Sequence, residues 1–226
     1  EIHERLVGSE MCIRDRNGAD KMTRVYFVRH AQPEHDWEED RTRPLTEEGK
    51  KDSAIVLEFL KDKKIDAFYC SPYKRSMDTI AEAADFFTKE IITDERLRER
   101  EKGLDGNNHG MFRKRWADHN YHEEGGESIA MVQKRNIEAL NEILSDNTDK
   151  DIVIGTHGTA LSTILNFYDN NFGCEDFLRI IDWMPYIIEL DFESSCNELE
   201  FECPSYSFKL IGKQEHCYIE KEFKGK

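Results

Sequence analysis

Basic and histidine side chains follow three short apolar runs of the chain. The run VYFV ends at Arg29 and His30, the run AFYC is followed by SPYKR with Arg75, and the run DIVIG is followed by a threonine and His157. Two arginines and two histidines without an interleaved acid are suited to binding a compact anion. Arginine holds a phosphoryl group through a fork of N–H donors. These residues therefore indicate a phosphate site.

The apolar and β-branched runs predict strands at residues 25–28, 66–70 and 151–155. Amphipathic segments between them predict helices, and strands joined by helices run parallel. The carboxyl ends of parallel strands lie at one edge of the sheet, where ligands bind. We expect an α/β fold, a three-layer α/β/α sandwich with a mostly parallel, Rossmann-like central sheet and a short lid insertion.

Two helix starts can be predicted from capping residues. Thr46 is a candidate N-cap, and two glutamates follow it in the first turn. Ser71 and Pro72 suit the N-cap and first position of another helix, which places Arg75 near free N–H groups that attract anions. The core face of the first helix is predicted to consist of Ile55, Val56, Phe59 and Leu60.

The rest of the chain gives weaker signals. Residues 91–92 predict a short extended segment, and the polar, glycine-punctuated residues 102–126 predict a lid. A helix is predicted over 129–144, another opens at residues 156–159, and residues 186–192 and 198–203 predict a closing antiparallel pair of strands. The lid holds a cluster that would either recognise a second acidic group or face solvent: Arg113, Lys114, Arg115 and Trp116.

Length and charge limit the class of protein. The 226 residues suit one domain, predicted over 22–226, and no apolar run approaches the length of a membrane span. The formal net charge of −15 argues against nucleic acid or an anionic membrane as a partner. Six scattered cysteines without a CxxC pair favour a reduced, cytoplasmic protein.

Residues 1–21 show neither helical nor strand periodicity, and LVGSEMCIRDR resembles translated sequencing-adaptor read-through. Because Met22 directly precedes the first predicted strand, we expect residues 1–21 to be a non-native or disordered leader.

Five motifs occur in a fixed order: RHAQ, SPYKRS, LRERE, GGES and THGT. In this order and spacing they resemble the histidine phosphatase superfamily, also called phosphoglycerate-mutase-like, over about Arg24 to Tyr168. The resemblance implies that His30 is a nucleophile that becomes a phosphohistidine. It also implies that Arg29 and Arg75 bind the phosphoryl oxygens, with His157 as a cationic or hydrogen-bonding partner.

The resemblance further implies that Glu99 of LRER donates a proton to the leaving alcohol. Glu99 would have to be protonated, and a bound phosphate would favour that form. Glu95 and Glu101 lie in the same charged run and are its competitors for this role. The family pattern implies no cofactor and no metal, because positive side chains stabilise the charge. Candidates for secondary contacts are Gln32, Ser128 and Thr159, of which Ser128 also suits a helix cap.

Other catalytic classes fit the sequence less well. Four residues separate Cys70 from Arg75, one fewer than the cysteine-phosphatase loop requires, so Cys70 is expected to be a buried structural thiol. His119 and His122 precede two glutamates, but HEEGGE is not the HExxH zinc motif and is expected to be a polar loop. Neither a GxSxG serine-hydrolase motif nor a GxxxxGK[ST] loop is present.

The predicted function is metal-independent hydrolysis of a phosphomonoester of a small metabolite through a phosphohistidine. Two alternatives stay open: a phosphoglycerate mutase-type phosphoryl transfer, and a noncatalytic phosphate-binding protein on the same fold. Mutases of the family resemble RHGESxWN at the first motif and carry a longer insertion before GES. This chain has RHAQPEHDW and only residues 100–125 in that interval, which favours hydrolysis.

Overall fold

A six-stranded sheet forms the centre of the computed structural model, which describes residues 22–104, 109–196 and 206–221. The strand order is β3-β2-β4-β1-β5-β6. The first four strands pair in parallel and the last two are antiparallel. Their bounds are β1 Met22–Arg29, β2 Ala67–Cys70, β3 Ile91–Thr93, β4 Asp151–Thr156, β5 Trp183–Cys196 and β6 Tyr206–Glu220.

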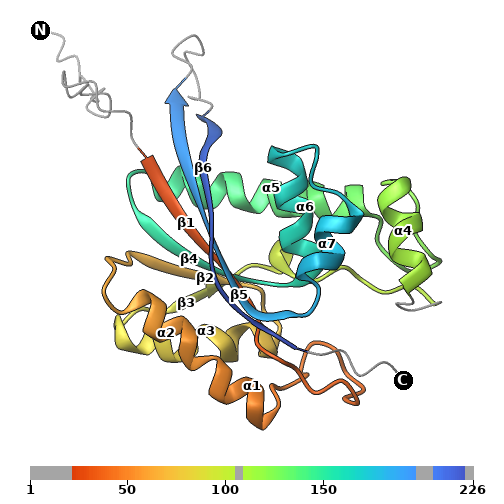
Figure 1. Cartoon of the computed structure of the whole chain (residues 1–226). Helices are drawn as coiled ribbons and strands as arrows, with labels where there is room; N and C mark the ends of the chain where they lie inside the picture. Colours follow the sequence, from red (N-terminus) through yellow and green to blue (C-terminus); the bar gives the residue numbers. More distant parts are fainter. Residues whose placement is uncertain (1–21, 105–108, 197–205, 222–226) are drawn as a thin grey trace, which may run out of the picture.

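Helices cover both faces of the sheet (Figure 1). On one face lie α1 Glu47–Asp52, α2 Ala54–Leu60 and α3 Lys74–Phe86; on the other lie α4 His109–Ala117, α5 Ile129–Asp146, α6 Gly158–Tyr168 and α7 Cys174–Ile180. The 3-10 helix η1 Glu95–Leu97 contacts α5. Alternate residues of β1 enter opposite cores: Val28 packs with Phe68 and Ile80, and Phe27 packs with Ile154 and Leu140. The predicted three-layer fold is confirmed.

The register of the parallel strands places the predicted site residues side by side. Arg29 pairs with Thr156, and Cys70 pairs with Gly155, so His30, Ser71 and His157 follow at the same edge. The backbone N–H of His30 donates to the Thr156 carbonyl at 3.1 Å, which extends this register by one residue. A side chain at Gly155 would lie 2.5 Å from the Cys70 Sγ, so the close packing of β2 on β4 requires glycine there.

The predicted helix starts are confirmed at one position and wrong at another. Thr46 is the N-cap of α1, and its Oγ1 accepts from the Gly49 N–H at 2.8 Å. The single helix expected after Thr46 is two helices, α1 and α2, which are separated at Ser53, where the hydroxyl donates to the Lys50 carbonyl at 2.7 Å. Ser71 is not an N-cap: α3 begins at Lys74, and Ser71 Oγ accepts from the Tyr73 N–H at 3.3 Å in a local turn.

The predictions for the remaining segments have mixed outcomes. Residues 91–92 lie in β3, and residues 186–192 lie within β5, which is longer because it pairs with β6. The second closing strand, predicted at 198–203, lies outside the described residues, and β6 itself was not predicted. Residues 1–21 also lie outside them. The predicted lid contains α4, which packs through Phe112 on Phe177 of α7, with ring centroids 5.2 Å apart.

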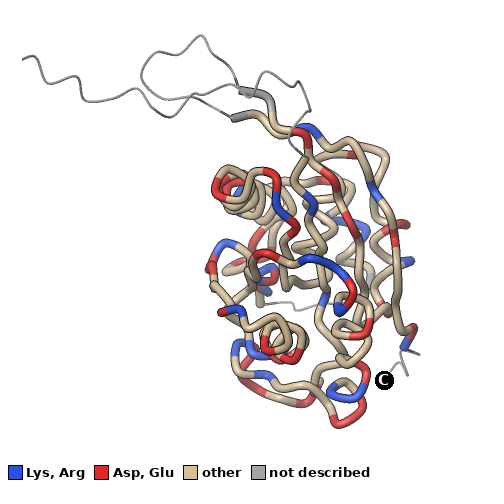
Figure 2. Tube along the Cα trace, turned by 90° about the vertical axis from the view of Figure 1, so that its left-hand side faces the viewer, with Lys and Arg blue, Asp and Glu red and all other residues tan. Residues whose placement is uncertain are grey.

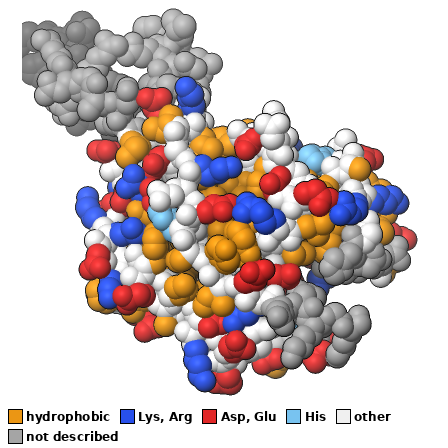
Figure 3. All heavy atoms as spheres, in the orientation of Figure 1, with side chains coloured by type: hydrophobic (Ala, Val, Ile, Leu, Met, Phe, Trp, Pro, Cys, Tyr) orange, Lys and Arg blue, Asp and Glu red, His pale blue; other side chains and the backbone are white. Residues whose placement is uncertain are grey.

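Both acidic and basic residues occur throughout the described elements (Figure 2). On the face drawn in Figure 3, charged side chains are interspersed with exposed hydrophobic ones. Within the described ranges, no helix combines the length and apolar character that crossing a bilayer would require.

Candidate active site

A pocket of about 320 Å³ opens at the carboxyl ends of the parallel strands. It is lined by Arg29 and His30 from the end of β1, Arg75 from the first turn of α3, and Glu99 from the loop after η1. Segments that are far apart in the sequence therefore meet in one pocket, as the strand-end argument predicted. His157, which was also expected to share the pocket, is fully buried and is not among the residues that line it. The described structure adds further lining residues, which include His35, Asp40, Arg43, Arg100, Lys102 and Asp182.

The imidazole of His30 is oriented by its own backbone. Its Nδ1 lies 2.8 Å from the Ala31 carbonyl oxygen, which can only accept, so Nδ1 carries the proton and Nε2 keeps its lone pair. Burial, followed by the charges of Arg75 and Arg29, lowers the pKa of His30 well below its ordinary value. A neutral imidazole with a free ring nitrogen beside two guanidinium groups is suited to attack an electrophilic phosphorus.

His157 lies directly behind His30. The two ring centroids are 5.2 Å apart at an interplanar angle of 61°, and His157 Nε2 lies 2.7 Å from the Ser71 hydroxyl. The Tyr73 ring also packs edge-on against His157, with ring centroids 5.2 Å apart. His157 is fully buried, and burial together with Arg75 and His30 lowers its pKa well below the ordinary value. This favours a neutral, hydrogen-bonding partner over a cationic one in the unliganded site.

Arg29 is almost fully buried against the start of α6. Its NH1 donates to the Ile180 carbonyl at 2.6 Å, while its buried Nε has no hydrogen-bond partner among the described residues. Burial lowers the pKa of Arg29 to about 10, so the guanidinium stays charged at neutral pH. A Cβ at position 158 would lie 3.2 Å from the guanidinium carbon, and Gly158 therefore lets the helix start approach this charge closely.

Arg75 is held by Asp40. Its NH1 donates to the Asp40 carbonyl at 2.7 Å, and both terminal nitrogens lie 3.4 Å from the carboxylate oxygens. The Tyr73 ring lies under the guanidinium, 5.0 Å from its carbon. Burial lowers the pKa of Arg75, and the Asp40 carboxylate opposes that effect. An anion that enters the pocket would share Arg75 with Asp40.

Glu99 is fixed by two backbone donors. Its Oε1 accepts from the Arg100 N–H at 2.7 Å, and its Oε2 accepts from the Thr159 N–H at 3.0 Å in the first turn of α6. Its competitors in the charged run are elsewhere. Glu95 pairs with Arg41, and Glu101 is exposed and 4.0 Å from Arg98; neither lines the pocket. Among the described glutamates of this run, the structure brings Glu99 to the pocket.

An ion network holds the backbone on both sides of Glu99. The Glu127 carboxylate accepts from Arg98, from Arg135 and from the Glu101 N–H, each at 2.8–3.0 Å. Arg135 in turn donates to the carbonyls of Arg96 and Arg98 at 2.7 Å, and to that of Glu99 at 3.0 Å. The glutamate of the GGES motif therefore anchors the loop that carries Glu99.

Glu127→Gln is expected to destabilise the fold by about 3 kcal/mol at neutral pH, because removing one partner of a buried ion pair leaves unpaired charges. Burial raises the pKa of Glu127, but hydrogen bonds from Arg135, Glu101 and Arg98 lower it to about 2, from 4.5. The stabilisation is thus present above pH 4.5 and lost as the pH falls toward about 2. Denaturant unfolding of both proteins should show the difference shrinking over that interval.

The matched control is Glu142→Gln, which removes the exposed partner of Arg96. Exposed pairs contribute less than about 1 kcal/mol. Equal destabilisation by the two substitutions would contradict a special role of the buried network.

Only one of the three residues predicted to make secondary contacts lies at the pocket. Thr159 lines the pocket, whereas Gln32 and Ser128 do not. The Gln32 side chain accepts from the Thr46 hydroxyl at 3.3 Å, beside the cap of α1. Ser128 is the N-cap of α5, and its Oγ accepts from the Met131 N–H at 3.1 Å. The helix-cap interpretation of Ser128 is confirmed.

The basic cluster predicted in the lid does not reach the pocket. Exposed Arg113 pairs with Glu175, and the Lys114 ammonium lies over the Tyr121 ring at 3.7 Å. Arg115 fits neither predicted alternative, because it is buried and its NH2 lies 2.6 Å from the Glu123 carboxylate. From α4 it is Phe112 that lines the pocket, where it forms an apolar wall with Phe177, Ile181 and Met184.

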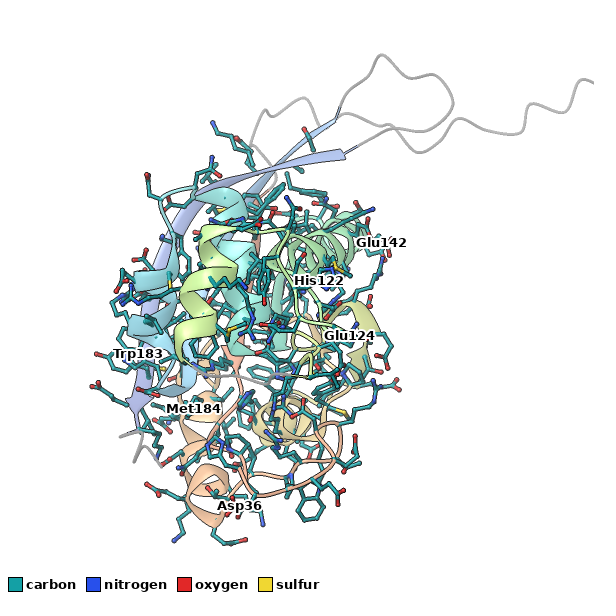
Figure 4. All side chains as sticks on the ribbon, turned by 90° about the vertical axis from the view of Figure 1, so that its right-hand side faces the viewer. Asp36, His122, Glu124, Glu142, Trp183 and Met184 are labelled. Atoms are coloured by element: carbon teal, nitrogen blue, oxygen red, sulfur yellow. The ribbon has the colours of Figure 1, made fainter. Side chains whose placement is uncertain are left out.

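The alternative chemistries have no matching geometry in the described residues. Cys70 is buried, lies 3.5 Å from the Ser76 hydroxyl, and has a pKa raised to about 12 by burial, as expected of a structural thiol. His122 and Glu124 lie on the loop after α4, apart from Met184 at the pocket (Figure 4). Within the described ranges, no group of three histidine, cysteine or acidic side chains is arranged to hold a metal ion.

Known proteins resemble the chain in sequence and in fold. A family model described as "Histidine phosphatase superfamily (branch 1)" matches residues 25–182. Phosphoserine phosphatase 1 of Hydrogenobacter thermophilus is 29% identical in an alignment 154 residues long, which covers 60% of this chain and 71% of that enzyme. The 2,3-bisphosphoglycerate-dependent phosphoglycerate mutase of Thermoplasma acidophilum is 44% identical over 55 residues, 24% of this chain and 28% of that enzyme.

A solved structure extends the similarity to the fold. A mycobacterial glucosyl-3-phosphoglycerate phosphatase superposes with a TM-score of 0.65, over 84% of this chain and 98% of that one. At 17% identity this likeness concerns the fold alone.

Proposed function

Because the chain belongs to the histidine phosphatase superfamily, we propose that it is a metal-independent phosphomonoester hydrolase that acts through a phosphohistidine. The observation that carries the proposal is the His30 imidazole. Its Nδ1 is bound by a carbonyl oxygen, and its pocket also contains Arg29, Arg75 and Glu99. A site for binding phosphate alone would need neither a free ring nitrogen nor a carboxyl group. This argues against the noncatalytic alternative.

The reaction proceeds in two balanced steps. In the first, the His30 Nε2 lone pair forms a bond to phosphorus, the ester P–O bond breaks, and protonated Glu99 gives its proton to the leaving oxygen. In the second, the Glu99 carboxylate takes a proton from water, the water oxygen bonds to phosphorus, and the P–N bond breaks with its electron pair returning to His30 Nε2. Inorganic phosphate leaves, and His30 is again neutral. Arg29 and Arg75 bind the phosphoryl oxygens through both steps. The role of His157 as a hydrogen-bonding partner stays a prediction, because its ring packs against His30 and does not line the pocket.

The relatives support a small phosphorylated metabolite as the substrate. Phosphoserine phosphatase 1, the relative with the larger coverage, is named for such a compound. We also retain, as predictions, a single catalytic domain over residues 22–226 and a cytoplasmic location.

The identity to a mutase supports a second candidate function, phosphoryl transfer to another metabolite instead of water. The two functions differ in the acceptor of the second step. Release of inorganic phosphate in proportion to substrate consumed would support hydrolysis, and an isomerised phosphoester without free phosphate would support the mutase.

Hydrolysis of p-nitrophenyl phosphate is expected to survive EDTA, because arginine side chains supply the positive charge that a metal would otherwise supply. Cys70→Ser is expected to retain activity as well, since the buried thiol lies outside the pocket lining. Each treatment should change the rate by less than the tenfold that corresponds to about 1.4 kcal/mol of barrier. A larger loss in a folded protein would indicate metal-dependent or thiol chemistry.

A further inference from the structure

The charge of the pocket exceeds what a phosphate ester needs. Five arginine or lysine side chains and three carboxylates line it: Arg29, Arg43, Arg75, Arg100 and Lys102, with Asp40, Glu99 and Asp182. When Glu99 is protonated for its role as the acid, these side chains carry three net positive charges. A phosphomonoester dianion neutralises two of them. One positive charge is left over, in a chain whose formal net charge is −15.

Arg43 is a candidate for the residue that uses this excess charge. Its side chain is 13% exposed, its NH1 lies 3.2 Å from the Asp40 carboxylate, and its NH2 donates to the Trp37 carbonyl at 3.3 Å. Its Nε is buried and has no hydrogen-bond partner among the described residues. A buried N–H donor without a partner is unfavourable, and an anion in the pocket would relieve that cost.

Lys102 provides a second cation in the pocket that Arg43 lines. It is exposed, and it lines the same pocket as Arg43 and His35. Burial lowers the pKa of His35, and the charges of Arg43 and, more weakly, Lys102 add to that effect, so both cations act on the His35 imidazole. Arg43 comes from the loop before α1, and Lys102 from the loop after Glu99, so two separate segments bring these cations to the pocket.

We propose that Arg43 and Lys102 form a second anion subsite that binds a carboxylate of the substrate, next to the phosphate held by Arg29 and Arg75. The substrate class is then a phosphorylated hydroxy acid or amino acid. A single remaining positive charge matches a carboxylate better than a second phosphate dianion. The inference rests on the proposed function, because the pocket must bind a phosphomonoester for a second subsite to matter.

The test compares two ligands that differ in one carboxylate, phosphoserine and phosphoethanolamine. Their binding is measured by calorimetry to the His30→Ala variant, which lacks the proposed nucleophile and therefore leaves both esters intact. Phosphoserine is expected to bind about 10- to 100-fold more tightly, the range for a charge-assisted hydrogen bond to a carboxylate. Equal dissociation constants would overturn the subsite.

Two further substitutions in the same background locate the subsite. The preference is the ratio of the dissociation constants of phosphoethanolamine and phosphoserine. Arg43→Met and Lys102→Met should each reduce this ratio by about threefold or more, as loss of one charged contact implies. Lys102 is exposed, so its variant tests the subsite even if loss of Arg43 disturbs Asp40. Equal weakening of both ligands by both substitutions would show contact with the phosphate instead, and would contradict the proposal.

Arg113→Met is the matched control, because Arg113 is an exposed basic residue of the lid that pairs with Glu175 outside the pocket lining. It should leave the ratio of the two dissociation constants unchanged. A decrease of this ratio equal to that caused by Lys102→Met would contradict the subsite. The proposed function is tested separately by turnover of p-nitrophenyl phosphate in the wild-type protein. If the wild-type protein hydrolyses p-nitrophenyl phosphate but binding shows no preference for phosphoserine, the subsite is contradicted and the proposed hydrolase function still stands.

Discussion

His30→Ala is expected to lower the rate of phosphomonoester hydrolysis by about 10⁴-fold or more, the scale on which enzymes lose activity when a covalent nucleophile is removed. The reason is chemical: alanine has no lone pair to attack phosphorus, the two arginines are cations that cannot act as nucleophiles, and Glu99 is required in its protonated form as the acid. The fold should persist, because His30 follows β1 and its backbone N–H bond to Thr156 does not involve the side chain. Steady-state kinetics with p-nitrophenyl phosphate measure the loss, and circular dichroism checks the fold.

His119→Gln is the control for this substitution. His119 packs on Trp116 with ring centroids 5.6 Å apart and does not line the pocket. Its variant should therefore keep most of the activity. If His30→Ala stayed within tenfold of the wild-type rate, the loss of about 1.4 kcal/mol would be too small for a nucleophile.

Glu99→Gln is expected to slow hydrolysis of alkyl phosphates by about 10²- to 10⁴-fold, the usual contribution of general acid catalysis. An alkoxide leaves poorly without a proton, whereas the phenolate of p-nitrophenyl phosphate is a stable leaving group. Loss of the acid should therefore affect the alkyl ester far more than the aryl ester. The measurement is the ratio of kcat for the two substrates in the wild-type and variant proteins.

This ratio separates acid catalysis from positioning. Glu99 accepts from Arg100 and Thr159 with two oxygens, and the glutamine amide has only one acceptor oxygen, so some local rearrangement accompanies the substitution. Rearrangement would slow both substrates to the same extent. An equal loss would thus assign Glu99 a positioning role, and a substrate-dependent loss in Glu101→Gln would mean that Glu101 is the acid.

The fold could be predicted where local pattern and tertiary packing agree. The strands at 25–28, 66–70 and 151–155 are apolar because both faces of the sheet are covered, and the structure has strands at each place. β6 was not predicted because lysine, glutamine and glycine interrupt its pattern, and its pairing with β5 comes from a distant backbone partner. Ser71 was wrongly predicted to be an N-cap, because its hydroxyl instead forms a hydrogen bond with His157, which is 86 residues away in the sequence.

The candidate site could be predicted only in part. Arg29, His30, Arg75 and Glu99 follow strands or lie in recognisable motifs, and they do line one pocket. Asp40, Arg43 and Lys102 lie on loops whose course depends on tertiary contacts, such as the Asp40 hydrogen bonds to Arg75. For the charged residues of the lid, the sequence left open whether they contact a ligand or face solvent. Exposed Arg113 fits the second alternative, whereas buried Arg115 pairs with Glu123 and fits neither.

The central claim, a covalent phosphohistidine at His30, can be tested by trapping the intermediate. Wild-type protein is mixed with a ³²P-labelled phosphomonoester, quenched in alkaline denaturant within the first turnover, and digested. We expect a label that is stable in base and labile in acid, on the peptide that contains His30, and none on the His30→Ala variant. A label on another peptide, or turnover by the wild-type protein with no labelled peptide at any quench time, would contradict the account.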